Sequence, residues 1–181
     1  MKNIDLANVD YIILHPKIDV NHFSCSSKEG SLPLQNFIRN HALDNQIKKL
    51  STTYVAIEKD APNIPLGFFS LANASIEVSD LPDEELHGVP KYNRFPALLI
   101  GKFAVCDEYQ HQGLGTWMMD IVNALTIVLS KYSGCRYLIV ESKPTSNWFY
   151  EEKCNFVKVR IQDDGNILFY RNTLTLLEKS E

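Results

Sequence analysis

The chain has 181 residues, of which 45% are hydrophobic and 22% are charged, with a formal net charge of −4. This composition is typical of a globular protein with a full hydrophobic core, so we expect a single domain over residues 1–181. The negative charge predicts no general attraction to nucleic acid or membranes. The first 85 residues hold 7 Lys and Arg against 12 Asp and Glu, whereas the remainder holds 11 against 10. A surface that binds a polyanion is therefore expected on the second half.

The four cysteines show neither a C-x-x-C pair nor the spacing of metal ligands, which favours reduced, buried thiols over disulfides or a metal site. They are Cys25, Cys106, Cys135 and Cys154. The N-terminus contains Asp5 and Asp10 and lacks the apolar core of a signal peptide. No apolar run approaches the ~20 residues that a membrane span requires. We expect a soluble, cytoplasmic protein that has no metal cofactor and does not bind membranes.

Apolar patterning predicts three strands and one helix in the first half of the chain. The helix covers residues 33–49, with Pro33 in its first turn. The strands cover residues 9–15, 52–58 and 66–78, and a turn over residues 60–63 ends the second of them. Residues 79–96 contain three prolines and one glycine, and we expect them to form a long loop.

The second half begins with an apolar strand over residues 97–105. A helix from Thr116 to Tyr132 follows, because its apolar residues recur every three or four positions, and Gly134 is placed to end it. The remaining expected elements are a strand over 136–141, a short helix from 145 or 146 to 153, and a hairpin of 156–160 with 167–171. Mixed helices and strands with an antiparallel ending predict an α+β fold.

The segment between that strand and that helix is the most informative part of the chain. A strand that turns through two glycines into a helix start builds a nest of backbone N–H groups, and the helix dipole adds positive potential. A Cβ would keep an anion away from such a backbone, which explains the small residues. The segment therefore predicts a site for a phosphate or pyrophosphate. Its residues are Gln110, His111, Gln112, Gly113, Leu114, Gly115 and Thr116.

Two nucleotide-binding patterns do not match this segment. A dinucleotide fingerprint needs a third glycine, and a Walker loop needs Gly-Lys-Ser/Thr where residues 115–117 read Gly-Thr-Trp. The order (Gln/Arg)-x-x-Gly-x-(Gly/Ala) resembles the coenzyme A loop of the GNAT N-acetyltransferase superfamily. The resemblance implies acetyl-CoA as co-substrate, bound through the main-chain amides of residues 110–116. An ordinary glycine-rich turn is the alternative.

Three further segments resemble the GNAT pattern in the right order. They are Phe103-Ala104-Val105, Leu138-Ile139-Val140-Glu141, and the segment from Asn147 to Phe156, in which Asn155 replaces the usual glycine. Asn tolerates a left-handed conformation, so the turn at Asn155 is expected to survive. The resemblance implies a mixed, mostly antiparallel central sheet that is splayed at the coenzyme A site and flanked by helices. It also implies that Phe103, Ala104 and Val105 contact the pantetheine arm. Asn147 is a further candidate for this contact, and ordinary capping at a helix start is its alternative.

The first half resembles one GNAT subgroup, the toxins of type II toxin–antitoxin modules, which acetylate the amino acid on charged tRNA. The likeness lies in Phe23-Ser24-Cys25 and in the segments that begin at Leu34, Thr53 and Leu66. Ser24 and Ser26 replace the usual Asp and Gly of that opening, and the gap to Leu34 is longer. The resemblance implies an aminoacyl-tRNA substrate, a ribbon-helix-helix antitoxin and a homodimer.

Acetyl transfer to an amine needs a stabilised oxyanion and a proton for the leaving thiolate. Backbone N–H groups near Val105 are suited to polarise the thioester carbonyl. The resemblance implies that Tyr150 protonates the sulfur, and a core tyrosine beside Phe149 is the alternative interpretation. Glu141 is a candidate proton relay, or else a solvated charge at the end of a strand.

A tRNA-binding surface needs cations that face phosphates, and we assign Lys91, Arg94 and Lys143 to the substrate. Further candidates on the less acidic half are Arg136, Lys153, Lys158 and Arg160. A solvated surface with scattered charges is the alternative. Two other functions also fit the sequence, namely a non-toxic GNAT enzyme that acetylates a small-molecule or protein amine, and a non-enzymatic coenzyme A sensor.

Overall fold

The computed structural model describes residues 2–26, 31–90 and 92–178. The chain divides into two compact units, the first formed by residues 1–72 and 101–121 and the second by residues 73–100 and 122–181. Three elements run from one unit into the other. They are β3 (Ala61–Glu77), β4 (Arg94–Val105) and α4 (Leu114–Ser133).

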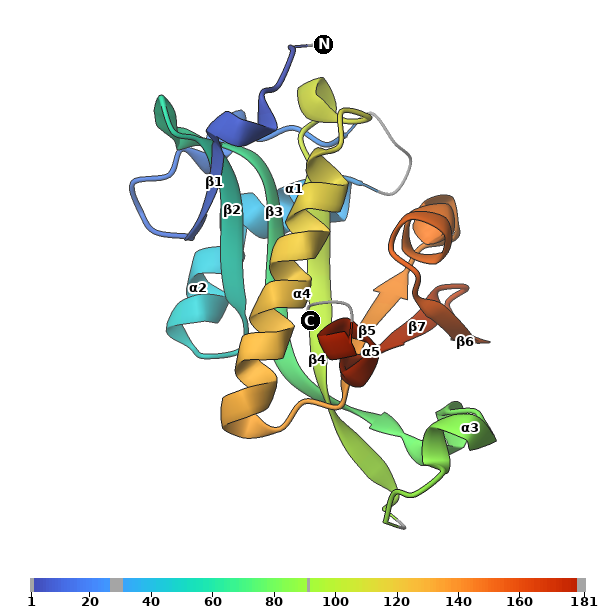
Figure 1. Cartoon of the computed structure of the whole chain (residues 1–181). Helices are drawn as coiled ribbons and strands as arrows, with labels where there is room; N and C mark the ends of the chain where they lie inside the picture. Colours follow the sequence, from blue (N-terminus) through green and yellow to red (C-terminus); the bar gives the residue numbers. More distant parts are fainter. Residues whose placement is uncertain (1, 27–30, 91, 179–181) are drawn as a thin grey trace. The chain divides into compact units, whose positions relative to one another are not determined.

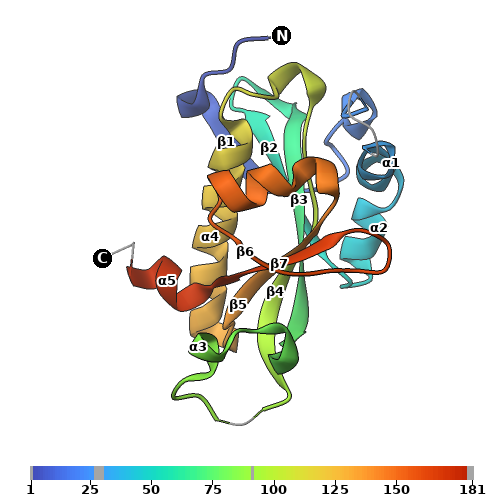
Figure 2. The same ribbon diagram turned by 90° about the vertical axis from the view of Figure 1, so that its right-hand side faces the viewer.

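The first unit is built on strands β1, β2 and the beginning of β3, which pair in antiparallel fashion (Figure 1). Val9 lies opposite Glu58, and Thr52 lies opposite Leu71. Figure 2 shows α1 and α2 together on one face of these strands. The elements that belong wholly to this unit are η1 (Leu6–Asn8), β1 (Val9–Ile13), η2 (Val20–His22), α1 (Leu32–Asn40), α2 (Ala42–Ile47), β2 (Thr52–Glu58) and η4 (Asp107–Tyr109).

Aromatic side chains fill the core of the first unit on both faces of β3. Successive residues of a strand point to opposite faces, so Phe68 and Phe69 serve different layers. Phe68 contacts the rings of Phe23 and Phe37, with ring centroids 5.3 and 6.1 Å away. Phe69 stacks on Tyr54, 5.1 Å away, and on Phe103 of β4, 6.4 Å away.

The second unit contains the other end of the sheet. Strand β4 pairs with β5 in parallel, from Ala97 opposite Tyr137 to Ile100 opposite Val140, and β7 pairs with both β5 and β6 in antiparallel fashion. The strand order is β1-β2-β3-β4-β5-β7-β6. The elements wholly in this unit are η3 (Val78–Asp80), α3 (Asp83–Leu86), β5 (Tyr137–Ser142), η5 (Pro144–Ser146), the π-helix η6 (Phe149–Lys153), β6 (Val157–Ile161), β7 (Ile167–Asn172) and α5 (Thr173–Glu178).

The parallel ladder between β4 and β5 is shorter than the strands that form it. Its last pair is Ile100 with Val140, but β4 continues to Val105 and β5 to Ser142. The α+β architecture with a mostly antiparallel sheet, predicted from the sequence, is confirmed.

Two predicted elements of the first half were wrong in detail. The helix expected over 33–49 is divided at His41, whose φ of −126° lies outside the α region, so α1 ends there and α2 begins. Of the turn expected over 60–63, Asp60 does lie in a turn, but residues 61–63 are instead the start of β3. Register shifts next to Ile57 place Ala61 opposite Glu58, and such irregular pairing tolerates the prolines of this strand.

The loop expected over residues 79–96 also contains structure. The short helix α3 is held by Glu85, whose carboxylate accepts hydrogen bonds from the Tyr137 hydroxyl, at 3.1 Å, and from Asn172 Nδ2, at 2.5 Å. Three acidic residues in the first turn of α3 stabilise the helix through their favourable interaction with its dipole. Strand β4 already begins at Arg94, and α5 was not predicted.

Gly67 of β3 allows helix α4 to lie close to the sheet in the first unit. A Cβ built on Gly67 would lie 2.6 Å from Met118 Sδ and 3.1 Å from the carbonyl oxygen of Ala104. Met118 is fully buried, so its sulfur has little room to move. This close approach fixes the start of α4 relative to the end of β4.

We expect Gly67→Ala to lower the free energy of unfolding by about 1–3 kcal/mol, because the added methyl group overpacks the contact with Met118. Urea unfolding of the purified variant measures the loss. Met118→Val removes the sulfur, so the double variant should be more stable than the sum of the two single effects predicts. Strict additivity would show that the contact is not the cause.

Candidate functional site

The junction between β4 and α4 presents a row of main-chain amides, and we refer to residues 110–116 as the amide loop. In the part of the chain that the structure describes, the N–H groups of residues 110–113 donate to no acceptor. The first bond of α4 runs from the N–H of Trp117 to the carbonyl of Gly113, so the N–H groups of Leu114, Gly115 and Thr116 belong to the unsatisfied first turn.

Two left-handed residues give the amide loop its shape. His111 has a φ of 62° and Gly113 a φ of 86°. A side chain at position 113 is disfavoured by this backbone conformation, and its Cβ would also lie 3.4 Å from Leu6 Cδ1. His111 and Gly113 are exposed, so the loop faces solvent.

The electrostatics of the amide loop favour an anion. Helix α4 is 20 residues long and carries no acidic residue in its first turn, so nothing there offsets the positive end of its dipole. The two acidic residues that precede the loop are engaged elsewhere. Glu108 forms an ion pair of 3.0 Å with Lys2, and the Asp107 carboxylate accepts three hydrogen bonds.

Several side chains of the amide loop contact the surrounding protein and do not project into solvent. Gln110 Nε2 donates to the carbonyl of Val105, at 3.1 Å, and to Asp107 Oδ1, at 3.2 Å, which closes the turn after β4. Gln112 bonds with the N-terminal segment and Leu114 is fully buried. The backbone of the loop is therefore the part that is available to a ligand. Ala104, the second-last residue of β4, is also buried.

Sequence reasoning missed Asp107. Its Oδ2 accepts hydrogen bonds from Ser24 Oγ, at 3.1 Å, and from the N–H of Ser26, at 3.0 Å, and its own N–H donates to the Ser24 carbonyl. The serines that depart from the toxin pattern thus bind the residue that supports Gln110. No spacing in the sequence signals a contact between positions so far apart.

Tyr150 lies in the second unit, on the π-helix η6. Its ring contacts those of Phe149, Phe156 and Phe169, with centroids 5.3, 5.7 and 6.2 Å away, and only 6% of the residue is exposed. Burial, with a smaller effect from Cys154, raises the pKa of Tyr150 well above its ordinary value. The hydroxyl donates no hydrogen bond to any described residue, although a buried tyrosine usually finds a partner. Its side chain is therefore a protonated phenol at neutral pH.

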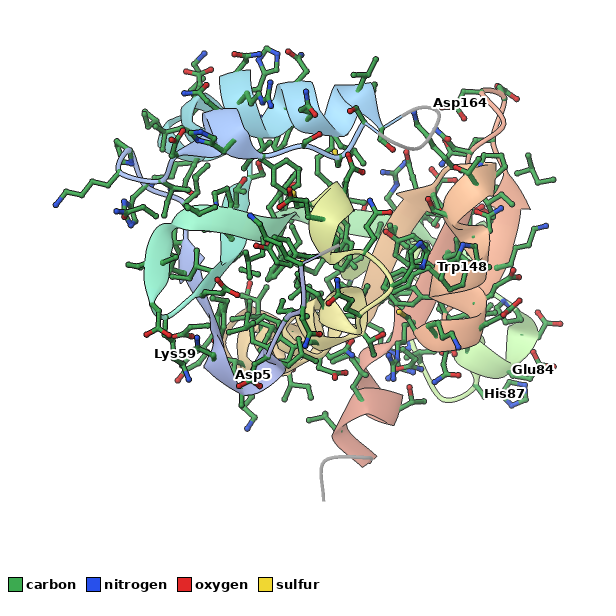
Figure 3. All side chains as sticks on the ribbon, turned by 90° about the horizontal axis from the view of Figure 1, so that it is seen from above. Asp5, Lys59, Glu84, His87, Trp148 and Asp164 are labelled. Atoms are coloured by element: carbon green, nitrogen blue, oxygen red, sulfur yellow. The ribbon has the colours of Figure 1, made fainter. Side chains whose placement is uncertain are left out.

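The segments on either side of η6 contain two asparagines that the sequence singled out. Asn147 caps η5, and its Oδ1 is buried without a hydrogen-bond partner, which is uncommon in native structures. Asn155 adopts a φ of 54°, so the left-handed turn predicted for this replacement of glycine is confirmed. Trp148, marked in Figure 3, is 40% exposed beside Asn147.

The residues predicted to contact the substrate differ in their exposure and in their ion pairs. Glu141 and Lys143 are exposed at the end of β5 and after it, and Lys91 lies outside the described residues. Arg94 is paired with Glu77 and also donates to Ser75 Oγ, at 3.4 Å.

The other basic residues that were candidates for binding tRNA phosphates also differ in their exposure and in their partners. Arg160 forms an ion pair of 2.9 Å with Asp80, and the guanidinium of Arg136 lies 5.7 Å from the centre of the Tyr137 ring. Lys153 and Lys158 are exposed. The charges of Arg94 and Arg160 are therefore satisfied locally.

The four cysteines are free and buried, as the sequence predicted. Within residues 2–26, 31–90 and 92–178, no group of three or more His, Cys, Asp or Glu side chains is placed to hold a metal ion. None of the helices in these ranges has the length and apolar character to cross a membrane.

The fold is shared with solved structures of AtaT and KacT. AtaT complexed with acetyl-methionyl-tRNAfMet is 20% identical over 96% of this chain and 99% of that one, with a TM-score of 0.84. A tyrosine-to-phenylalanine mutant of KacT is 20% identical over 95% and 99%, with a TM-score of 0.82. A tyrosine-to-phenylalanine mutant of the AtaT toxin, bound to the C-terminus of the antitoxin AtaR and acetyl-CoA, is 18% identical over 96% and 99%, with a TM-score of 0.75.

No family model matches the chain. At identities of 18–20% the likeness to AtaT and KacT shows the fold alone, and that fold is the GNAT fold that the sequence resemblance implied. The match covers 95–96% of this chain and 99% of each of those chains.

Cys25 gives a pH dependence that can be measured. Burial, with a smaller effect from the Asp107 carboxylate, raises the pKa of its thiol from 9.0 to about 11. In the unfolded chain the thiol loses its proton first, so between pH 9 and pH 11 the native state binds the extra proton. We expect this group to lower the free energy of unfolding over that window by on the order of 1–3 kcal/mol.

Urea unfolding at pH 8, 10 and 11 measures this loss, with Cys25→Ala as the comparison. Because other groups titrate in the same range, the difference between the two pH profiles isolates Cys25. The variant should lose less stability than the wild type as the pH rises, and parallel profiles would contradict the assignment.

Proposed function

We propose that the chain is an N-acetyltransferase that transfers the acetyl group of acetyl-CoA to a primary amine. The observation that supports this most strongly is the amide loop, a row of main-chain N–H groups that donate to none of the described residues, at the start of a long helix without an acidic first turn. Such a site suits a diphosphate. The loop occurs in a fold shared with AtaT, which has been solved with acetyl-CoA bound.

The coenzyme would bind through backbone and side-chain groups along its length. In our proposal the amides of residues 110–116 hold the diphosphate, and Phe103, Ala104 and Val105 hydrogen-bond the pantetheine arm through their backbone. The β4–β5 ladder stops at Ile100, before these residues. Asn147 supplies an amide oxygen that no protein group satisfies.

Tyr150 is the proposed general acid. The amine nitrogen forms a bond with the thioester carbonyl carbon, the carbon–sulfur bond breaks, and the Tyr150 hydroxyl gives its proton to the leaving thiolate. The raised pKa of Tyr150 keeps this proton in place at neutral pH. The proton of the amine leaves to water, with exposed Glu141 as the proposed relay, and Tyr150 recovers its proton from solvent.

For the acceptor we propose the amino acid of aminoacyl-tRNA, which would make the chain a toxin that blocks translation in the cytoplasm. Two observations support this choice, namely the likeness of the first half to the toxin subgroup and the AtaT structure with acetyl-methionyl-tRNAfMet. The pKa of a free α-amine is ~8, whereas that of a lysine side chain is ~10.4, so an α-amine acceptor needs no strong base. In this proposal Lys91, Arg94 and Lys143 face the tRNA, a ribbon-helix-helix antitoxin neutralises the enzyme, and the enzyme is a homodimer.

A second candidate is a non-toxic enzyme that acetylates a small-molecule or protein amine. The ion pairs of Arg94 and Arg160 favour it, because they remove two of the cations proposed for tRNA phosphates. The net charge of −4 also favours this second candidate.

Controlled expression in a bacterial host separates the two candidates. The toxin should arrest growth, and tRNA from the arrested cells should carry N-acetylated aminoacyl groups that mass spectrometry detects. Normal growth with unmodified tRNA, together with acetyl transfer to free amines in vitro, would favour the second candidate. Absence of both activities would contradict an acetyltransferase.

Tyr150→Phe should reduce kcat about 100-fold or more, the usual range for loss of a general acid, because the leaving thiolate no longer receives a proton. The ring contacts remain, so the Kd for acetyl-CoA should change less than about threefold. Steady-state kinetics and calorimetry measure the two quantities. Tyr132→Phe is a matched control, because Tyr132 is 86% exposed. A Tyr150→Phe variant with wild-type kcat would remove Tyr150 from the mechanism.

A further inference from the structure

The N-terminal residues 2–8, here called the strap, lie against the amide loop, and Figure 1 shows both at the same end of strands β1–β3. Gln112 makes the connection. Its Oε1 accepts from the N–H of Ile4, at 3.1 Å, and its Nε2 donates to the carbonyls of Lys2, at 2.8 Å, and Glu108, at 3.1 Å. One side chain thus bonds the strap and η4 together.

Two further contacts hold the strap to the same loop. The ion pair between Lys2 and Glu108 spans 3.0 Å, and Leu6 lies against Gly113, where an added Cβ would meet its Cδ1 at 3.4 Å. The ion pair is exposed and contributes little by itself. The hydrogen bond from the N–H of Ile4 to Gln112 Oε1 is partly shielded from water, whereas the two bonds that Gln112 Nε2 donates are exposed, so the bond from Ile4 is the stronger restraint.

The far end of the strap is fixed to the turn between β2 and β3. Lys59 donates to the carbonyl of Ala7 through Nζ, at 2.9 Å, and to that of Asn8 through its N–H, at 3.0 Å. Asn8 Nδ2 donates to Asp60 Oδ2, at 2.9 Å. The strap therefore links the amide loop to a β-hairpin of the same unit.

We infer that Gln112 is a positioning residue, through which the strap holds the amide loop in the conformation that binds the diphosphate of acetyl-CoA. This inference rests on the proposed function. The loop has two left-handed residues, and no partner among the described residues fixes the direction of its N–H groups. A loop held in its binding conformation before the ligand arrives has less entropy to lose on binding. The side chain of Gln112 acts on the loop and does not contact the ligand.

The test compares Gln112→Leu with the wild type in calorimetry with acetyl-CoA. We expect the Kd and the KM for acetyl-CoA to rise roughly three- to thirtyfold, as the loss of the two hydrogen bonds to the strap predicts, with kcat at saturating acetyl-CoA within about twofold of wild type. Gln46→Leu is the matched control, because Gln46 also bridges backbone groups of the first unit, at Leu14 and Thr53. It should lose comparable stability and keep the wild-type Kd.

A second variant removes the same link from the strap side. Ile4→Pro has no N–H to donate to Gln112 and should weaken acetyl-CoA binding in the same direction. The double variant Ile4→Pro/Gln112→Leu should bind no more weakly than Gln112→Leu by itself, because the bond is already lost.

The outcomes distinguish this inference from the proposed function. A wild-type protein that binds no acetyl-CoA overturns both. A wild-type protein that binds it, with an unchanged Kd in both Gln112→Leu and Ile4→Pro, overturns the inference alone. A similar loss of binding in Gln46→Leu also overturns it, since the effect would then follow from general destabilisation.

Discussion

The direction of seven main-chain N–H groups, at residues 110–116, is the constraint on which the proposed site depends. Backbone amides do not choose their direction by themselves, so the surrounding chain must set it. Close packing at Gly67 places α4 on the sheet, and left-handed His111 and Gly113 turn the chain into the helix. Two glutamine side chains, Gln110 and Gln112, then bind the loop to β4 and to the N-terminal segment. Main-chain donors held in this way lose little order when an anion arrives.

Local patterns predicted much of the fold. Strand β2 has the expected bounds, Thr52–Glu58, and α4 begins two residues before the expected start. The amide loop was predicted as well, because a strand, two glycines and an amphipathic helix are all short-range signals. The division at His41 and the start of β3 at Ala61 were not, because both depend on backbone geometry that composition only weakly determines.

Long-range polar contacts could not be predicted from the sequence. The carboxylate of Asp107 binds Ser24 and Ser26, some 80 positions away, and Gln112 binds the N-terminal backbone, over 100 positions away. Neither pairing follows a repeat or a spacing rule, so only the folded chain shows them. The same holds for the surroundings of Tyr150, whose ring packs against three phenylalanine rings from different parts of the second unit. Sequence identifies the chemistry of these residues, and tertiary structure decides their roles.

The burial of all four cysteines has a practical consequence for enzymology. Each turnover of an acetyl-CoA-dependent transferase releases one free coenzyme thiol, which a chromogenic disulfide reagent titrates continuously. The protein's own sulfhydryls are 2–8% exposed, and Cys25 remains protonated at neutral pH because its pKa is about 11. The native protein therefore contributes almost no background colour, and any amine can be screened as acceptor in the same cuvette without a label.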